Sequence, residues 1–190
     1  MSNQKTTKPT AEEVIPDILD GDMKKNAMKF AAYMRENKML LKQHSTSPGS
    51  QSAKYKGKII CEVLLSKNGN SSFGTFSGSH WLVIPNICHA TNYEDLILKE
   101  ELQNIIWNNP LYCRWGKNRK LSTKTQNCDP KKHRCAGGTN LTLCGKTLIG
   151  VCYCRPYPII CNPDETEIKA IKRLVELEKR ARDEKNINSK

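Results

Sequence analysis

Apolar residues recur at helical spacing near the start of the chain and predict an amphipathic helix over residues 23–37, with Asp22 placed as its N-cap. The apolar members of its buried face are Ala27, Phe30, Ala31 and Met34. The preceding residues 1–21 are polar and contain Pro9 and Pro16. We therefore expect a flexible leader over 1–21 and an ordered domain that begins at residue 22.

The spacing then changes to that of β-strands. Apolar residues occupy every second position of residues 58–65, and some of the positions between them are apolar as well. This pattern is typical of a largely buried strand. Asn68-Gly69 favours a hairpin turn, and residues 80–84 supply a returning strand. Residues 141–153 are also β-like, interrupted by a turn at 144–146. These segments together predict an antiparallel sheet.

Two helical segments follow the first strands. Residues 93–108 place Leu98, Leu102 and Ile105 at helical spacing. A C-terminal helix is predicted over 162–184, because Asn162 suits the N-cap and Pro163 the first helical position. Its apolar stripe is Ile168, Ile171, Leu174, Val175 and Leu177. Helices at both ends with strands between them predict an α+β fold, with helices packed on an antiparallel sheet.

Length and composition agree with one folded domain, which we place at residues 22–185. The chain has 190 residues, of which 37% are hydrophobic, and its mean hydropathy is −0.63. No segment approaches the roughly 20 apolar residues that span a bilayer. Residues 1–16 lack the apolar run of a signal peptide. We therefore expect a cytoplasmic protein with no membrane association.

Charge and cysteine are concentrated in residues 111–161, a basic cysteine-rich segment. The chain has a net charge of +12 and nine cysteines. This segment carries ten Lys and Arg against one acidic residue, Asp129, and seven of the nine cysteines. Between Cys113 and Leu141 it contains little apolar material, so hydrophobic burial alone would not order it.

A structural zinc ion would order such a loop, because its binding free energy contributes to folding. The candidate ligands are Cys113, Cys128, Cys135 and one of Cys152 or Cys154, with His133 as a substitute. Positive charge nearby would lower thiol pKa values and favour thiolates. Paired Cys-x-x-Cys motifs are absent. Buried or unpaired thiols, and disulfide or redox chemistry, therefore stay open as alternatives.

The same segment suggests an anionic partner. The candidate anion-binding or nucleic-acid-binding residues are Arg114, Lys117, Arg119, Lys120, Lys131, Lys132 and Arg134. Lysine and arginine neutralise phosphates, and Tyr112, Trp115 and Tyr153 could stack on bases. No recognition helix or ribonucleoprotein-type aromatic motif is present. We therefore favour a solvated basic loop over a nucleic-acid-binding site.

A thiol-dependent enzyme is a further alternative, because Cys88 and His89 are adjacent in sequence. On an extended chain, however, adjacent side chains point to opposite sides. His44, His80 and His133 are scattered, and no glycine-rich phosphate loop, serine elbow or His-Glu-x-x-His motif occurs. Non-enzymatic function is therefore the preferred interpretation.

Five segments occur in a characteristic order: the helix 27–35, the strands 55–61 and 80–83, the Ile105-Ile-Trp-Asn-Asn109 motif and the Asn162-Pro-Asp-Glu165 helix start. Together they resemble an uncharacterised family of small bacterial α+β proteins with a C-terminal cysteine cluster. The likeness covers residues 24–180, and residues 114–134 look like an insertion relative to it. The resemblance implies no activity.

The leading hypothesis is a cytoplasmic binding module whose basic loop is held by a thiolate-bound zinc ion. Its ligand would be an anionic small molecule or a macromolecule. Nucleic-acid binding and thiol-dependent catalysis are the alternatives.

Overall fold

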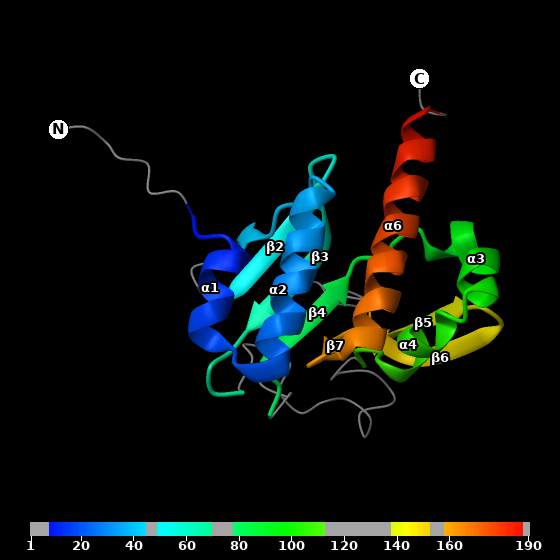
Figure 1. Ribbon diagram of the computed structural model, residues 1–190. Helices are drawn as coiled ribbons and strands as arrows, with labels where there is room; N and C mark the ends of the chain where they lie inside the picture. The colour runs from blue at the N-terminus through cyan, green and yellow to red at the C-terminus, as the bar shows by residue number, and fades with distance from the viewer. Residues whose placement is uncertain (1–7, 45–48, 70–77, 113–137, 153–157, 188–190) are drawn as a thin grey trace, which may run out of the picture.

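The computed structural model describes residues 8–44, 49–69, 78–112, 138–152 and 158–187. Within these ranges the chain forms an antiparallel five-stranded sheet in the order β1-β2-β3-β4-β7, and a separate hairpin of β5 and β6 (Figure 1). The strands of the sheet are β1 (Lys42–Gln43), β2 (Ser50–Tyr55), β3 (Lys58–Leu65), β4 (Trp81–Pro85) and β7 (Ile160–Cys161). The hairpin consists of β5 (Gly138–Leu143) and β6 (Lys146–Cys152). The predicted antiparallel sheet is thus present.

Helices pack against the sheet, which confirms the predicted α+β class. They are α1 (Ala11–Ile18), α2 (Gly21–Glu36), the 3-10 helix η1 (Ala90–Tyr93), α3 (Glu94–Lys99), α4 (Gln103–Asn108) and α6 (Glu165–Ile187). Figure 1 shows α1 and α2 on one side of the sheet, with α6 between the sheet and the η1–α4 region. Among the described helices, none is both long and apolar enough to cross a membrane.

The expectation of a flexible leader over 1–21 is wrong for residues 11–18, which form α1. The carboxylate of Glu13 accepts hydrogen bonds from the Thr10 backbone nitrogen at 2.7 Å and from the Thr10 hydroxyl at 3.0 Å. Ala11 and Ile15 lie one turn apart and are both buried in the main core. The capping interaction and this apolar pair outweigh Pro16, so the domain begins before residue 22.

The main core lies between the sheet and helices α1, α2 and α6. From the sheet it receives Cys61, Val63, Leu65, Trp81 and Val83. From α2 it receives the predicted face, Ala27, Phe30, Ala31 and Met34. Trp81 is fully buried. The helix that carries this face begins at Gly21 with Asp20 as its N-cap, two residues before the predicted cap at Asp22.

Two smaller apolar clusters complete the domain. One lies between α6, the segment η1–α4 and the β5–β6 turn, and includes Ile97, Ile106 and Leu174. The other covers the opposite face of the sheet and includes Leu82, Ile84 and Cys152. Because α6 contributes residues both to the main core and to the cluster beside η1–α4, it joins the sheet to the η1–α4 region.

The predicted single helix over 93–108 is divided. Glu101 has φ +55 and ends α3, while the Leu102 backbone nitrogen donates to the Ile97 carbonyl at 2.9 Å. A residue in the left-handed conformation, followed by a residue whose backbone nitrogen makes this hydrogen bond, is the Schellman motif that ends helices. The division changes the buried face: Ile97 and Ile106 are buried, whereas Leu98 is 45% exposed.

The C-terminal helix begins at Glu165 and not at Asn162, because Asp164 is its cap. The Glu167 nitrogen donates to Asp164 Oδ1 at 2.8 Å, and the Asp164 nitrogen donates to a Glu167 carboxylate oxygen at 3.1 Å. Asn162 instead has φ +45 and bonds the start of β4. The helix also continues to Ile187, beyond the predicted end at residue 184, and its apolar side extends to Ala181.

Candidate metal centre

Most residues of the predicted zinc site lie outside the described ranges. These are Cys113, Cys128, Cys135 and Cys154, together with His133. The same is true of the anion-binding candidates Arg114, Lys117, Arg119, Lys120, Lys131, Lys132 and Arg134. Both sets therefore remain predictions.

The cysteines of the basic segment that the structure does describe pack as apolar side chains. Cys152 ends β6 and is buried beside Leu82 and Leu111. Cys144 lies in the cluster under α3, and Cys161 packs against the cluster that holds Cys152. Among the described residues, Cys152 belongs to no group of potential metal ligands.

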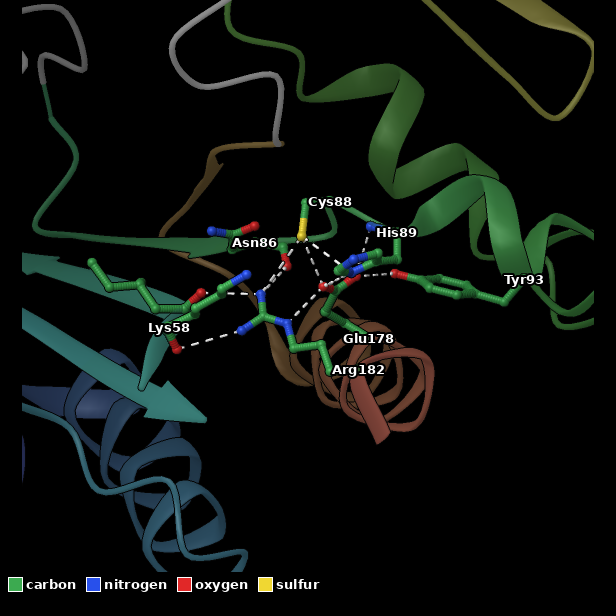
Figure 2. A network of polar contacts seen from close by, with 8 residues as sticks. Lys58, Asn86, Cys88, His89, Tyr93, Glu178 and Arg182 are labelled. Carbon is green, nitrogen blue, oxygen red and sulfur yellow. Dashed lines mark hydrogen bonds and ion pairs between the residues drawn. The ribbon is translucent and has the colours of Figure 1, made fainter. Parts of the chain in front are cut away.

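The structure instead brings together Cys88, His89 and Glu178 (Figure 2). Cys88 Sγ lies 3.2 Å from His89 Nδ1 and 3.1 Å from Glu178 Oε1. His89 Nδ1 lies 2.8 Å from the same Glu178 Oε1. A sulfur, a nitrogen and an oxygen thus meet at one point, although the turn and the helix that supply them are almost 90 residues apart.

The end of the sheet positions the Cys88-His89 pair. After β4 ends at Pro85, the Asn86 backbone nitrogen still donates to the Ile60 carbonyl at 2.9 Å, and the chain then turns. The Cys88 and His89 side chains were expected to point apart, on the assumption of an extended chain. That expectation is wrong because both residues lie in the turn that leads into η1, where neighbouring side chains can converge.

Glu178 approaches from α6 and is fully buried. Its Oε2 accepts hydrogen bonds from the Tyr93 hydroxyl and from the His89 backbone nitrogen, both at 3.0 Å. Its Oε1 accepts a bond from Arg182 Nε at 2.8 Å, one helical turn later. These donors fix the carboxylate, so that Oε1 faces the Cys88-His89 pair.

The guanidinium group of Arg182 ties this site to the sheet. It is 5% exposed, and its other nitrogens lie near the backbone carbonyls of Lys58, Ile59 and Asn86 at 3.1–3.4 Å. Its Nη2 also lies 3.8 Å from Cys88 Sγ. A buried charge with this many acceptors is compensated and held in one orientation.

The electrostatics of the site follow from burial and these contacts. Burial would raise the pKa of Glu178, but hydrogen bonds from His89, Arg182 and Cys88 outweigh it and lower the pKa. Burial and the bond to Glu178 raise the pKa of the Cys88 thiol, and Arg182 only partly opposes this. Burial likewise raises the pKa of Tyr93. The carboxylate is therefore the ionised acceptor, and the thiol and phenol are protonated donors.

This geometry does not suit a thiol nucleophile activated by histidine. In such a relay the base uses one ring nitrogen for the thiol and the other for the orienting carboxylate. Here Cys88 and Glu178 both lie against Nδ1 of His89, and the thiol also donates to Glu178. One nitrogen carries either a proton or a lone pair, so it cannot serve both partners in these roles.

The same convergence suits a metal ion. Zinc bonds are about 2.3 Å to sulfur and about 2.0–2.2 Å to nitrogen and oxygen, which places tetrahedral ligand atoms roughly 3.4–3.6 Å apart. The three observed separations are 2.8–3.2 Å. Replacing the thiol and imidazole protons by zinc would therefore spread the three atoms by about half an ångström.

Glu178 and Arg182 were missed in the sequence because the predicted apolar stripe of the last helix ended at Leu177. A usable signal was present. Glu178 follows Leu174 by four residues and precedes Ala181 by three, so it lies within the apolar stripe. A charged residue at such a position needs a buried partner, and Arg182 stands one turn later.

Comparison with protein-family models, curated proteins and solved structures finds no match to this chain. The resemblance to a bacterial α+β family therefore stays a prediction, and the site has to be interpreted from its own geometry.

Proposed function

We propose that the protein binds a divalent transition metal ion, with zinc as the first candidate, through Cys88 Sγ, His89 Nδ1 and Glu178 Oε1. The observation that carries the proposal is the convergence of these three atoms within 3.2 Å of one another. Thiolate, imidazole and carboxylate are the three ligand types that zinc takes in proteins.

The surroundings of the three ligands support the proposal. The Tyr93 hydroxyl and the His89 backbone nitrogen hold Oε2 of Glu178, and Arg182 Nε bonds Oε1, so that Oε1 is fixed in a position facing the Cys88-His89 pair. Hydrogen bonds that orient a ligating carboxylate in this way strengthen metal sites. A zinc-bound loop formed by the cysteines of segment 111–161 is a separate prediction, and the two sites could coexist.

We place this function in the cytoplasm, because a thiol ligand has to stay reduced. The five cysteines that the structure describes are unbridged, which agrees with a reducing compartment. The anionic partner expected for the basic segment is retained as part of the proposal.

Zinc titration of the reduced full-length chain against a chromophoric chelator tests the proposal. Because other cysteines can also bind zinc, the informative quantity is the difference between wild type and Cys88→Ser. Serine keeps a hydroxyl donor toward Glu178 but removes the sulfur ligand. We expect the variant to lose one zinc equivalent, or to bind it more than about 100-fold more weakly.

His89→Ala should lose the same equivalent, whereas Cys161→Ser is the matched control and should keep it. Cys161 is a partly buried cysteine of β7 outside the group. If wild type, Cys88→Ser and His89→Ala bind equal amounts of zinc with equal affinity, the proposal is wrong.

A further inference from the structure

We infer that a metal ion held by Cys88, His89 and Glu178 keeps one coordination position open to solvent, and that this position binds a small anion through a single donor atom. The inference rests on the proposed metal site and names the class of ligand that the site would take. It stands on the number of protein ligands, on the exposure of the two faces of the site, and on its charge.

The number of protein ligands leaves a tetrahedral metal incomplete. Within the part of the chain that the structure describes, the group of potential ligands consists of one cysteine, one histidine and one glutamate. Two polar side chains in contact with Glu178 do not complete the set: the Tyr93 hydroxyl bonds the other carboxylate oxygen, and Arg182 offers only N–H donors. Three protein ligands plus one exchangeable ligand is the arrangement of open zinc sites, in contrast to closed structural sites with four.

The open position would face solvent because the two sides of the site differ in exposure. On the inner side, the Glu178 side chain is 0% exposed and comes from α6. On the outer side, Cys88 is exposed and the His89 side chain is 17% exposed. Figure 2 shows Cys88 and His89 approaching from the turn and Glu178 from the helix below. A small molecule could therefore reach the metal from the turn side without moving α6.

Charge selects an anion over a neutral ligand. A thiolate from Cys88 and the carboxylate of Glu178 together cancel the two positive charges of the metal. The Arg182 guanidinium lies 2.8 Å from Glu178 and within 3.8 Å of Cys88 Sγ, so the charges of the metal, the two anionic ligands and Arg182 sum to +1. At a partly buried position this charge favours hydroxide, azide, thiocyanate or a carboxylate at the open position.

Cobalt(II) provides the test, because its visible absorption reports on coordination. The full-length chain is loaded with one equivalent of cobalt, and the spectrum of Cys88→Ser is subtracted to isolate this site. Sodium azide is then titrated, with neutral imidazole titrated in parallel. We expect azide to shift the difference bands with saturation, and at lower concentrations than imidazole does.

Replacing Arg182 tests the charge argument. In Arg182→Met, azide affinity should fall about tenfold, while Arg182→Lys keeps the charge and should lose less. If Arg182→Met does not fold, the comparison of azide with imidazole in wild type decides the question.

The outcomes separate this inference from the proposed function. A Cys88-dependent cobalt spectrum that azide does not change would overturn the open anion position and leave the metal site standing. Equal binding of azide and imidazole would overturn the choice of an anion. A cobalt spectrum that is identical in wild type and Cys88→Ser would reject the metal site itself, and the inference with it.

Discussion

Nε of Arg182 donates to Oε1 of Glu178 at 2.8 Å, so one turn of α6 carries both charges of a buried ion pair. The side chains are 6% and 0% exposed. The Glu178 side chain points toward the turn that carries Cys88 and His89. The Arg182 side chain points toward the start of β3 and the end of β4. The pair therefore fixes the helix to both structures, and both charges depend on staying paired.

Breaking this pair from one side should be costly. Glu178→Gln or Arg182→Met leaves the other charge buried without its partner, and we expect the free energy of unfolding to fall by about 3–5 kcal/mol in each case. Urea unfolding followed by tryptophan fluorescence would measure the loss, because Trp81 is fully buried. The double variant Glu178→Gln, Arg182→Met should cost less than the sum of the two single variants.

The exposed pair between Lys56 and Asp183 is the matched control. Its side chains are 42% and 43% exposed, so Lys56→Met should cost no more than about 1 kcal/mol. Strictly additive losses in the Glu178 and Arg182 double variant would contradict the coupling of the buried pair.

Asn162 provides a second test, because its side chain joins β7 to the start of β4. Its Oδ1 accepts bonds from the backbone nitrogens of His80 and Trp81, and its Nδ2 donates to the Gly78 carbonyl at 3.1 Å. Asn162→Ala removes all three and places alanine at φ +45, so we expect a loss of about 2–4 kcal/mol in the free energy of unfolding.

Asn162→Asp separates the two contributions in the same urea experiment. Aspartate keeps the acceptor toward His80 and Trp81 and tolerates the left-handed conformation, but it cannot donate to Gly78. Its loss should be about 1 kcal/mol. Equal losses for the alanine and aspartate variants would show that the acceptor role contributes nothing.

The end of α3 offers a stabilising change. Glu101 occupies the left-handed position of the helix end at φ +55, where glycine avoids the steric cost of a side chain. Glu101→Gly should raise the free energy of unfolding by up to about 1 kcal/mol, measured by thermal or urea unfolding. Lys169→Gly, at an exposed position inside α6, is the control and should lower it by about 1 kcal/mol.

Local patterns predicted the elements of the fold well. The buried faces of α2, β3 and α6 follow from their apolar spacing, and the antiparallel sheet follows from the order of strands and turns. The errors are α1, which was expected to be part of a flexible leader, and the helix ends. Glu101 takes a conformation that its residue type does not indicate, and Asn162 is used by β4 and not by the helix that it precedes.

The candidate site was beyond prediction because it depends on tertiary contacts. Cys88 and His89 were recognised as neighbours, but the turn that brings their side chains together is not encoded in their spacing. Glu178 lies 89 residues after His89, and only the packing of α6 against the end of the sheet places its carboxylate beside them. The one indication of the site that the sequence does contain is Glu178, a charged residue within the apolar stripe of a helix.

The ion pair between Glu100 and Arg173 predicts a dependence of stability on pH. Arg173 donates to both carboxylate oxygens of Glu100 at 2.6 Å, and this hydrogen bonding lowers the pKa of Glu100 below its ordinary value of 4.5. Because the pKa is lower in the folded state, the stabilisation is fully present above the unfolded pKa and disappears as the pH falls through the folded pKa.

Glu100→Gln should therefore reduce the free energy of unfolding near neutral pH by less than about 1 kcal/mol, since the pair is partly exposed. The difference from wild type should shrink as the pH falls below 4.5. Urea unfolding at several pH values down to about pH 3 measures this. Arg173→Gln should show the same convergence with wild type, whereas curves that stay parallel down to the lowest pH would show that Arg173 does not affect the ionisation of Glu100.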